Sequence, residues 1–546
     1  MLCFSVCCLV SLLFLSAVDS GKTLRKIKEQ LQKNKQLKFM SEEQPLQQVE
    51  ESWLEQPLDH FNRLKVKTFS QKFFVNEAHW DRPDGPVFLF IGGEGPIFKF
   101  DVLAALGFIT TNQTVISLLF FSCSYVLMPS LGDKLHFFQS LNLNIFADIF
   151  PGHHVEMAQQ HRALLLAVEH RFYGDSINPD GLKTESLADL SSQQALADLA
   201  AFHGYICHKF NLTSRNLWVS FGGSYSGALS AWFRGKFPNL VYAAVASSAP
   251  VEAKLDFSAY NHVVGLSLKN TAVGGSEKCW AQVQQAFAAV EAELIAGNFS
   301  QLAADFSCCQ IPQNLDDQIE LMQNLAGVIM GAVQYNEEGV LMSISEICDL
   351  MTNISGERTE MKPYSRLIKL AQIYRSSTEE KCLDVSHEKT IQDLMDMSVH
   401  SSRRAERQWT YQTCTEFGFY QTCEDPTCPF SGLINLQAQT KLCTAVFGIS
   451  QHSLPSRIAF TNSYYGGDEP HTHRVLYING GIDPWKELSV VQGGGEVQSV
   501  FIDDTAHCAD MSSRRFAKRD SLRKARQEIE KQVSDWLRTA SLEKMD

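Results

Sequence analysis

A serine lies at the turn between an apolar strand and a helical segment in NLWVSFGGSYSG, residues 216–227. A chain that passes this sharply from strand to helix strains the residue at the apex and lifts its side chain clear of the sheet. This is the geometry of the nucleophile elbow, G-x-S-x-G. Gly222 fills the first glycine position, and Ser226 replaces the second. The pattern predicts Ser224 as a nucleophile, although an ordinary glycine-rich turn fits these five residues equally well.

A nucleophilic serine needs a general base, and that base needs a carboxylate to orient it. Near the C-terminus, VLYINGGIDPW places Asp483 after one apolar strand, and VFIDDTAHC places His507 just past the next. Both positions lie outside the carboxyl ends of strands, where active sites of parallel sheets form. The order Ser, Asp, His is also the order that follows a nucleophile elbow. We therefore predict a catalytic triad of Ser224, Asp483 and His507.

The negative charge that develops during acyl transfer requires two backbone N–H donors. Tyr225 directly follows the nucleophile and is predicted to supply one. Gly93, in the early loop GGEGP, is predicted to supply the other. A simple tight turn would explain the composition of that loop equally well. No metal ion and no cofactor are expected, because the cysteines lack the C-x-x-C spacing typical of zinc sites.

Continuous apolar strands separated by helical patterns predict a parallel sheet that is covered on both faces. Between about residues 258 and 443 the strand pattern stops, and apolar residues recur at helical spacing. We therefore expect an α/β fold whose core is formed by residues 51–257 and 444–546, with a helical cap domain stapled by disulfides at 258–443. The expected strands are Val87–Ile91, Leu164–Val168 and those in the segments NLWVSFGG, LVYAAVASS, HRVLYINGG and VQSVFIDD.

The chain carries features of a secreted protein. Residues 1–20 form an apolar run ending in small residues, which predicts a signal peptide. Residues 21–50 are polar and are expected to form a solvated helix, a flexible lead or a propeptide. Twelve of the 15 cysteines follow the signal peptide and favour disulfides. Glycosylation sequons occur at Asn112, Asn211, Asn298 and Asn353.

The net charge of −13, with no compensating basic stretch, argues against a nucleic-acid partner. A homodimer is compatible with the sequence. The apolar segment at about 101–151 fits no expected element of the sheet. It could be a membrane span, an insertion from non-standard splicing or a packed subdomain. Its longest apolar run only reaches the short end of the membrane-spanning range, so no stable span is expected.

Several long motifs identify a family resemblance: GGEGP, EHRFYG, FGGSYSGALSAWFRGKFP, QWTYQTCTEFGFYQTCEDPTCPFS and DPW. They resemble the serine peptidase family of lysosomal Pro-Xaa carboxypeptidase and dipeptidyl peptidase II. The resemblance implies an α/β-hydrolase core with a helical cap, and it places the family's nucleophile, acid and base on Ser224, Asp483 and His507. It also implies an endosomal or lysosomal protein that trims peptides for class II antigen presentation.

A peptide substrate has terminal charges that an enzyme must pair. Glu169 of EHRFYG and Glu416 of CTEFGF could meet an amino terminus, and Arg171 could meet a carboxylate. Trp485 of DPW is a further candidate for substrate binding. Structural ion pairs explain the charged residues equally well. The alternative functions are a serine esterase or lipase, and a chain whose insertion blocks the site and leaves only a binding role.

Deletion of residues 101–151 tests the interpretation of that segment. Crossover connections in α/β folds are compact, so the deletion should reconnect the GGEGP loop to the helix and strand that follow. We expect better secretion and higher specific activity than for the full chain, because an exposed apolar segment promotes aggregation. Secretion yield and turnover per active site measure both effects. Loss of folding on deletion would identify a genuine subdomain.

Overall fold

The computed structural model of the protein describes residues 22–23, 26–27, 30–31, 49–103, 152–337, 342–352, 361–398, 404–494, 497–514 and 519–542. The predicted signal peptide and nearly all of the 101–151 segment lie outside these residues. Sequons Asn112 and Asn353 also lie outside them, whereas Asn211 and Asn298 are exposed on the surface. Within the described part of the chain, no helix is both long and apolar enough to cross a bilayer.

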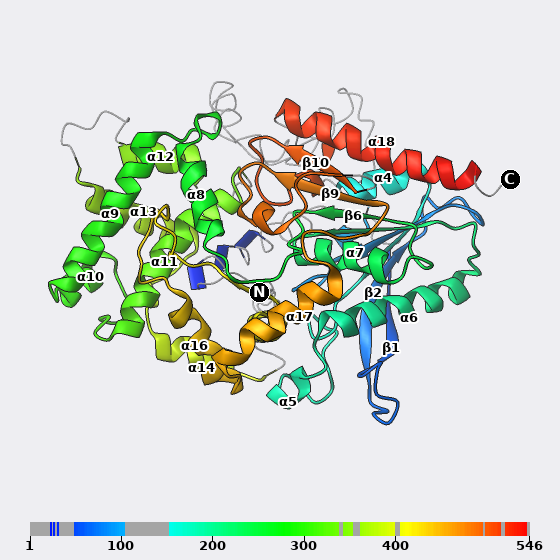
Figure 1. Cartoon of the computed structure of the whole chain (residues 1–546), viewed down its shortest axis with the longest axis horizontal. Coiled ribbons are helices and arrows are strands. Elements are labelled where there is room, and N and C mark those ends of the chain that lie inside the picture. Colours follow the sequence, from blue (N-terminus) through cyan, green and yellow to red (C-terminus); the bar gives the residue numbers. More distant parts are fainter. Residues whose placement is uncertain are drawn as a thin grey trace, which may run out of the picture.

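In the described residues, an eight-stranded sheet forms the core, with the strand order β1-β2-β4-β3-β5-β6-β9-β10 (Figure 1). The first two strands pair antiparallel, and β2 is also antiparallel to β4. All six predicted strands are present and run parallel to one another. This is the expected α/β-hydrolase core. The strands are β1 (Val49–Pro57), β2 (Thr68–Asn76), β3 (Val87–Ile91), β4 (Leu164–Val168), β5 (Trp218–Gly223), β6 (Ala243–Ser247), β9 (Val475–Gly480) and β10 (Gln498–Ile502).

Helices cover both faces of the sheet, as Figure 1 shows for α6 and α18. Successive side chains of a strand point to opposite faces. Val87 and Leu89 of β3 therefore pack into one core with α6 (Ser192–Phe210) and α7 (Tyr225–Lys236). Phe88 packs into the opposite core with α4 (His153–His161) and α18 (Asp520–Leu542). Burial on both sides explains why these strands are continuously apolar.

A helical cap lies beside the sheet and is connected back to β9 by α17 (Leu454–Tyr465) (Figure 1). It also contributes β8 (Gly418–Tyr420), which pairs in parallel with β7 (Lys254–Asp256). The cap elements are α8 (Ala259–Lys269), α9 (Glu277–Ile295), α10 (Phe299–Asp305), α11 (Leu315–Gln334), α12 (Ile344–Thr352), α13 (Pro363–Ser377), α14 (His387–Met395), α15 (Arg404–Gln412), the π-helical turn η5 (Thr413–Phe417) and α16 (Leu436–Phe447).

Disulfides staple the cap, as the sequence predicted. In the described residues they are Cys279–Cys348, Cys309–Cys382, Cys414–Cys443 and Cys423–Cys428. Cys308 lies next to a bridged cysteine but is itself not bridged. The cap helices are joined by long connections, and covalent closure of those loops restricts the unfolded chain and stabilises the fold.

The described residues of the polar N-terminal segment pack against the inner side of the cap (Figure 1). Ile27 and Leu31 are buried in the same core as the cap helices. Thr23 donates a hydrogen bond to Asn324 of α11 at 3.0 Å. Lys22 forms an ion pair with Asp384 at 3.4 Å, and both side chains are largely buried. This segment therefore contributes to the packing of the cap.

The Arg171–Asp198 ion pair gives a test of stability. Both side chains are buried, and the guanidinium donates to the two carboxylate oxygens at 2.6 and 2.7 Å. We expect Arg171→Leu to lower the free energy of unfolding by about 3–5 kcal/mol, because it removes the guanidinium charge from the buried Asp198 carboxylate, which keeps its contact with the His60 ring at 2.7 Å. Denaturant unfolding measures the change. The matched control is Arg215→Leu, which breaks an exposed pair with Asp84 and should cost about 1 kcal/mol or less. Unchanged stability with a raised KM would instead identify Arg171 as a substrate contact.

Candidate active site

Ser224 lies in a strained turn that follows the carboxyl end of β5. It is the residue between the end of β5 and the start of α7, with φ 62° and ψ −133°. A side-chain-bearing residue rarely adopts this conformation, and such strain is concentrated at functional sites. The Ser224 backbone N–H is held by the carbonyl oxygen of Ser247 at 2.9 Å. Ser224 is partly exposed, whereas Tyr225 is buried, so the turn presents the hydroxyl-bearing residue outward.

Close packing explains the residue types around this turn. A Cβ atom at Gly222 would collide with the carbonyl oxygen of Ser226, so the first glycine of the motif is required. Ser226 replaces the second glycine without disturbing the turn. Its hydroxyl accepts a hydrogen bond from the Gly223 N–H at 2.9 Å and donates to the Gly223 carbonyl at 3.0 Å.

Asp483 and His507 are in direct contact. His507 Nδ1 lies 3.0 Å from Oδ1 and 2.9 Å from Oδ2 of Asp483, and both residues are buried. Asp483 follows β9 and accepts a hydrogen bond from the backbone N–H of Trp485, at the start of the 3₁₀ turn η7 (Pro484–Leu488). Because a carboxylate only accepts, the neutral imidazole carries its proton on Nδ1. Nε2 is then the basic nitrogen.

The environment raises the affinity of His507 for a proton. Burial alone lowers its pKa, but the Asp483 carboxylate and the neighbouring Cys508 thiol act in the opposite direction. Desolvation is the largest single effect, but the charge of Asp483, the contact with Cys508 and the hydrogen bonds to both together outweigh it. The pKa of His507 consequently lies well above its ordinary value of 6.5.

The loop that carries His507 lies against the serine turn. The Cys508 N–H donates to the hydroxyl of Ser248 at 2.9 Å. A Cβ atom placed on Gly223 would lie 2.9 Å from Cys508 Sγ, so this loop contacts the residue immediately before Ser224. The strands that precede Ser224, Asp483 and His507 belong to one run of neighbours, β5-β6-β9-β10. All three residues thus follow the carboxyl ends of strands at the same edge of the sheet.

The predicted oxyanion loop also packs against the serine turn. A Cβ atom on Gly93 would lie 3.2 Å from Ser226 Cβ and 3.4 Å from Ser226 N. Glu169 anchors this loop, since its carboxylate accepts from the Ile97 N–H at 3.2 Å and from the Ser176 hydroxyl at 2.7 Å. Burial raises the pKa of Glu169 to about 7, although nearby Lys72 opposes the shift. Gly93 and Tyr225 are therefore on adjacent packed segments.

A buried network that sequence reasoning missed fixes Tyr225. His170 donates from Nδ1 to the Arg171 carbonyl, so its Nε2 accepts from the Tyr225 hydroxyl at 3.0 Å. Burial lowers the pKa of His170 to about 4, which keeps this ring neutral. Gln412 donates to the same Tyr225 hydroxyl at 3.1 Å and to Glu416 at 3.0 Å. The residue after Ser224 is thus held by both core and cap.

The predicted substrate-binding residues lie in different settings. Glu416 is buried and accepts from the Ser192 N–H at 2.9 Å and from the Ser192 hydroxyl at 2.6 Å, at the start of α6. Burial raises the pKa of Glu416. Glu169, Arg171 and Glu416 all contact protein groups, and as substrate contacts they stay predictions. Trp485 lines a pocket between core and cap.

A cap residue that no motif marked holds the base in place. The carbonyl of Gln334, at the end of α11, accepts from the His507 N–H at 3.1 Å. Its side-chain oxygen accepts from the Trp485 indole at 3.1 Å and from the Tyr260 hydroxyl at 2.6 Å. Only the amphipathic period of α11 was visible in the sequence, and it does not identify a polar residue at the helix end as a contact of the base.

Metal ligation was not expected from the sequence. Among the residues for which the structure gives positions, no group of three or more His, Cys, Asp or Glu side chains is arranged to hold a metal ion. The described site combines a serine in a strained turn with a buried histidine–aspartate pair on a neighbouring loop.

The family model described as Serine carboxypeptidase S28 matches residues 56–114 and 145–529. The chain belongs to this family. It is 41% identical over 492 residues to thymus-specific serine protease of Homo sapiens, covering 89% of this chain and 87% of that protein. It is 25% identical over 480 residues to lysosomal Pro-X carboxypeptidase of Mus musculus, covering 84% and 83%. The family resemblance inferred from the motifs is confirmed, and the chain is a serine-type peptidase.

The family match omits residues 115–144, which fall within the segment 101–151 that fits no expected element of the sheet. Among solved structures, proline iminopeptidase of Mycobacterium smegmatis is similar over 90% of this chain and 99% of its own, at 11% identity and a TM-score of 0.35. That likeness concerns the fold alone.

The raised pKa of His507 predicts the pH dependence of hydrolysis. A general base must be neutral, so kcat/KM should fall as the pH drops through the pKa of His507, which lies above 6.5.

Asp483→Asn removes the charge that raises this pKa. We expect the acid limb of the pH–rate profile to move to lower pH and kcat to fall by about 10⁴-fold, as in the Ser-His-Asp template. Asp503→Asn, in the turn that follows β10 and precedes His507, is the matched control and should leave the limb in place. A profile without a titration above pH 6.5 in the parent enzyme would contradict the assignment.

Proposed function

We propose that the chain hydrolyses peptide bonds through an acyl-enzyme formed on Ser224, with His507 as general base and Asp483 as the orienting acid. The observation that carries this proposal is the buried Asp483–His507 pair, set on a loop that packs against the strained turn of Ser224. Membership of the S28 family supports a serine mechanism on peptide substrates.

The reaction begins with attack of Ser224 Oγ on the scissile carbonyl carbon, while His507 Nε2 takes the serine proton. The pair with Asp483 stabilises the imidazolium that forms. Backbone N–H groups of Tyr225 and Gly93 would donate to the oxyanion. His507 then gives the proton to the leaving amine as the C–N bond breaks. Water, activated by the same histidine, hydrolyses the acyl-enzyme and regenerates the serine.

The raised pKa of His507 affects how the enzyme would work in the proposed compartment. We propose residence in endosomes or lysosomes. One relative is named as a lysosomal enzyme, and the disulfides of the cap require an oxidising route. Because the pKa of His507 is raised, the free enzyme would hold much of this residue protonated in an acidic compartment. It would therefore work below its maximal rate there.

The position of the cap limits which substrates can reach the site. The cap contacts the base through Gln334 and the elbow through Gln412, so a substrate must enter between cap and core. We propose an exopeptidase-like action on short peptides, and, as the family resemblance implies, a role in generating peptides for class II antigen presentation.

Substitution of the nucleophile tests the mechanism. Ser224→Ala should reduce peptide hydrolysis by several orders of magnitude, because the nucleophile of the acyl-enzyme is lost. Unfolding and secretion should be unchanged, since the partly exposed hydroxyl has no packing role. Labelling by a fluorophosphonate, followed by rates on a panel of peptides and esters, measures the loss.

Ser226→Ala is the matched control, because it removes a hydroxyl two residues away in the same turn and should keep most of the activity. Full activity in Ser224→Ala would reject the proposed nucleophile. Labelling of the parent with turnover of esters alone would favour the esterase alternative. A folded parent that is neither labelled nor active would favour the blocked, binding-only chain.

A further inference from the structure

A pocket in the cap borders the candidate active site. Its walls include Trp409 of α15, Phe419 of β8, Gln439 of α16 and Trp485. The Trp409 ring centroid lies 5.3 Å from that of Tyr225, the residue after the nucleophile. The Trp485 ring centroid lies 6.3 Å from that of His507. Two walls of the pocket therefore contact rings that belong to the candidate active site.

Four of the charged residues that line the pocket are in ion pairs within the protein, and a fifth, Glu406, is buried. Glu320 lies 3.1 Å from His387, and Asp316 lies 2.8 Å from Lys441. Lys22 is paired with Asp384. A charged ligand would have to compete with these three ion pairs. The capacity of the pocket for new polar contacts lies in its uncharged groups.

Two uncharged polar atoms in the pocket walls have unused hydrogen-bonding capacity. Among the described residues, neither the indole Nε1 of Trp409 nor the amide Oε1 of Gln439 has a hydrogen-bond partner, although both side chains are more than nine-tenths buried. The orientation of the Gln439 amide is set by its Nε2, which donates to the Gln421 carbonyl at 2.9 Å. A buried polar atom without a partner is unfavourable. One donor and one acceptor are thus available in the same pocket.

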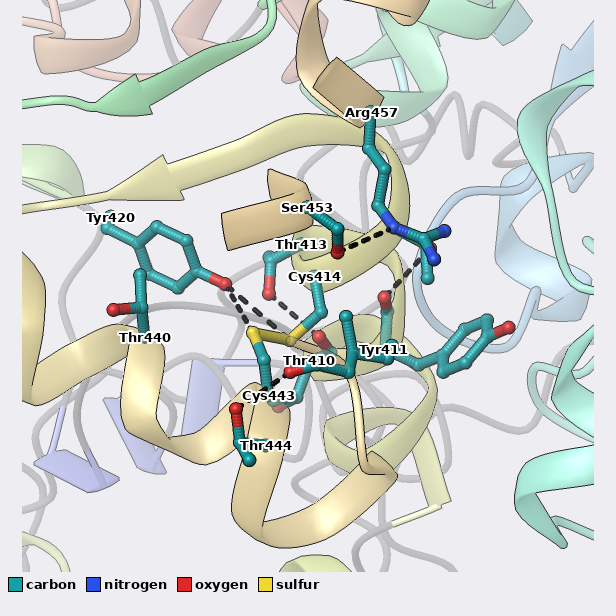
Figure 2. Close-up of a disulfide and its surroundings, with 12 residues drawn as sticks. Thr410, Tyr411, Thr413, Cys414, Tyr420, Thr440, Cys443, Thr444, Ser453 and Arg457 are labelled. Carbon is teal, nitrogen blue, oxygen red and sulfur yellow. Dashed lines mark hydrogen bonds between the residues drawn. A yellow bond between two sulfur atoms is a disulfide. The ribbon is translucent and has the colours of Figure 1, made fainter. Parts of the chain in front are cut away.

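A disulfide links the two elements that carry these atoms. Figure 2 shows the bridge between Cys414, which follows α15, and Cys443 of α16. Gln439 lies four residues before Cys443, one helical turn away. Tyr420, another residue of the pocket wall, makes a hydrogen bond of 3.0 Å with Cys443 Sγ. The spacing of α15 and α16 is fixed before any ligand binds, which reduces the entropy lost on binding.

We propose that this pocket binds the main chain of the peptide substrate, with Trp409 Nε1 donating to a backbone carbonyl and Gln439 Oε1 accepting from a backbone N–H. The peptide backbone offers one donor and one acceptor per residue, which matches the two available atoms. An ester of a fatty acid offers no N–H. The aromatic walls pack against neighbouring side chains without selecting one by charge. The inference rests on the proposed function and extends it, because the pocket would recognise the main chain that is common to all peptides.

Two conservative variants test the proposal. Trp409→Phe removes the N–H and keeps an aromatic ring, and Gln439→Met removes the acceptor at similar length. Each should raise KM for a peptide substrate about fivefold with little change in kcat, the effect of one neutral hydrogen bond. Hydrolysis of an acetyl ester, which has no peptide backbone to bind in the pocket, and the rate of fluorophosphonate labelling should not change.

A modified substrate gives an independent readout. A set of peptides methylated at one backbone nitrogen after another should contain one member that raises KM for the parent enzyme by a similar factor. The same peptide should bind Gln439→Met as well as the unmodified peptide does, because the acceptor is already absent. Trp232→Phe is the matched control, since Trp232 also has an unpartnered buried indole nitrogen among the described residues but does not line the pocket.

The outcomes separate this inference from the proposed function. Peptide turnover with an unchanged KM in both variants would overturn the main-chain site and leave the peptidase mechanism intact. Equal losses on peptide and acetyl ester would also overturn it, by showing that Trp409 acts through the position of Tyr225. Labelling of the parent without turnover of any peptide would instead reject the proposed function.

Discussion

The buried contact between Asp483 and His507 is the interaction on which the architecture of the site depends. A carboxylate loses its hydration when it is buried, and it remains charged there only if other groups compensate. The imidazole, the Trp485 N–H and the start of η7 supply that compensation. The cap completes the environment, because Gln334 holds the backbone of His507 and the side chain of Trp485. The environment of His507 is therefore built by core and cap together.

The motifs that identify the family meet in one polar network beneath the serine turn. Tyr225 follows the nucleophile, His170 comes from the loop after β4, and Gln412 and Glu416 come from the cap. Their hydrogen bonds run from the core through Tyr225 to the start of α6. Networks of this kind rigidify a structure when every member is satisfied. They hold the residue next to the nucleophile while leaving Ser224 itself partly exposed.

The connections between the cap helices are irregular, and disulfides restrain the cap covalently. Among the described residues, Cys279–Cys348 joins α9 to α12, Cys309–Cys382 joins two connecting segments, and Cys414–Cys443 joins η5 to α16. The Cys414–Cys443 bridge lies beside the pocket, so the restraint acts where substrate would bind (Figure 2). A preorganised cleft loses less entropy on binding than a mobile one. The same disulfides match a protein that folds in an oxidising compartment.

Local spacing in the sequence determined the six parallel strands, the turn at Ser224 and the positions of Asp483 and His507 after later strands. These features could be predicted because burial on both faces of a sheet and a sharp strand-to-helix turn each dictate nearby residue types. Only the tertiary structure decided what Glu169, Arg171 and Glu416 contact, and which cysteines pair. It also brought Gln334 to His507 and placed Trp409 and Gln439 in the lining of one pocket. Each of these depends on how helices far apart in the chain pack against the sheet, and residue types alone do not specify whether a buried polar group faces a neighbour or a ligand.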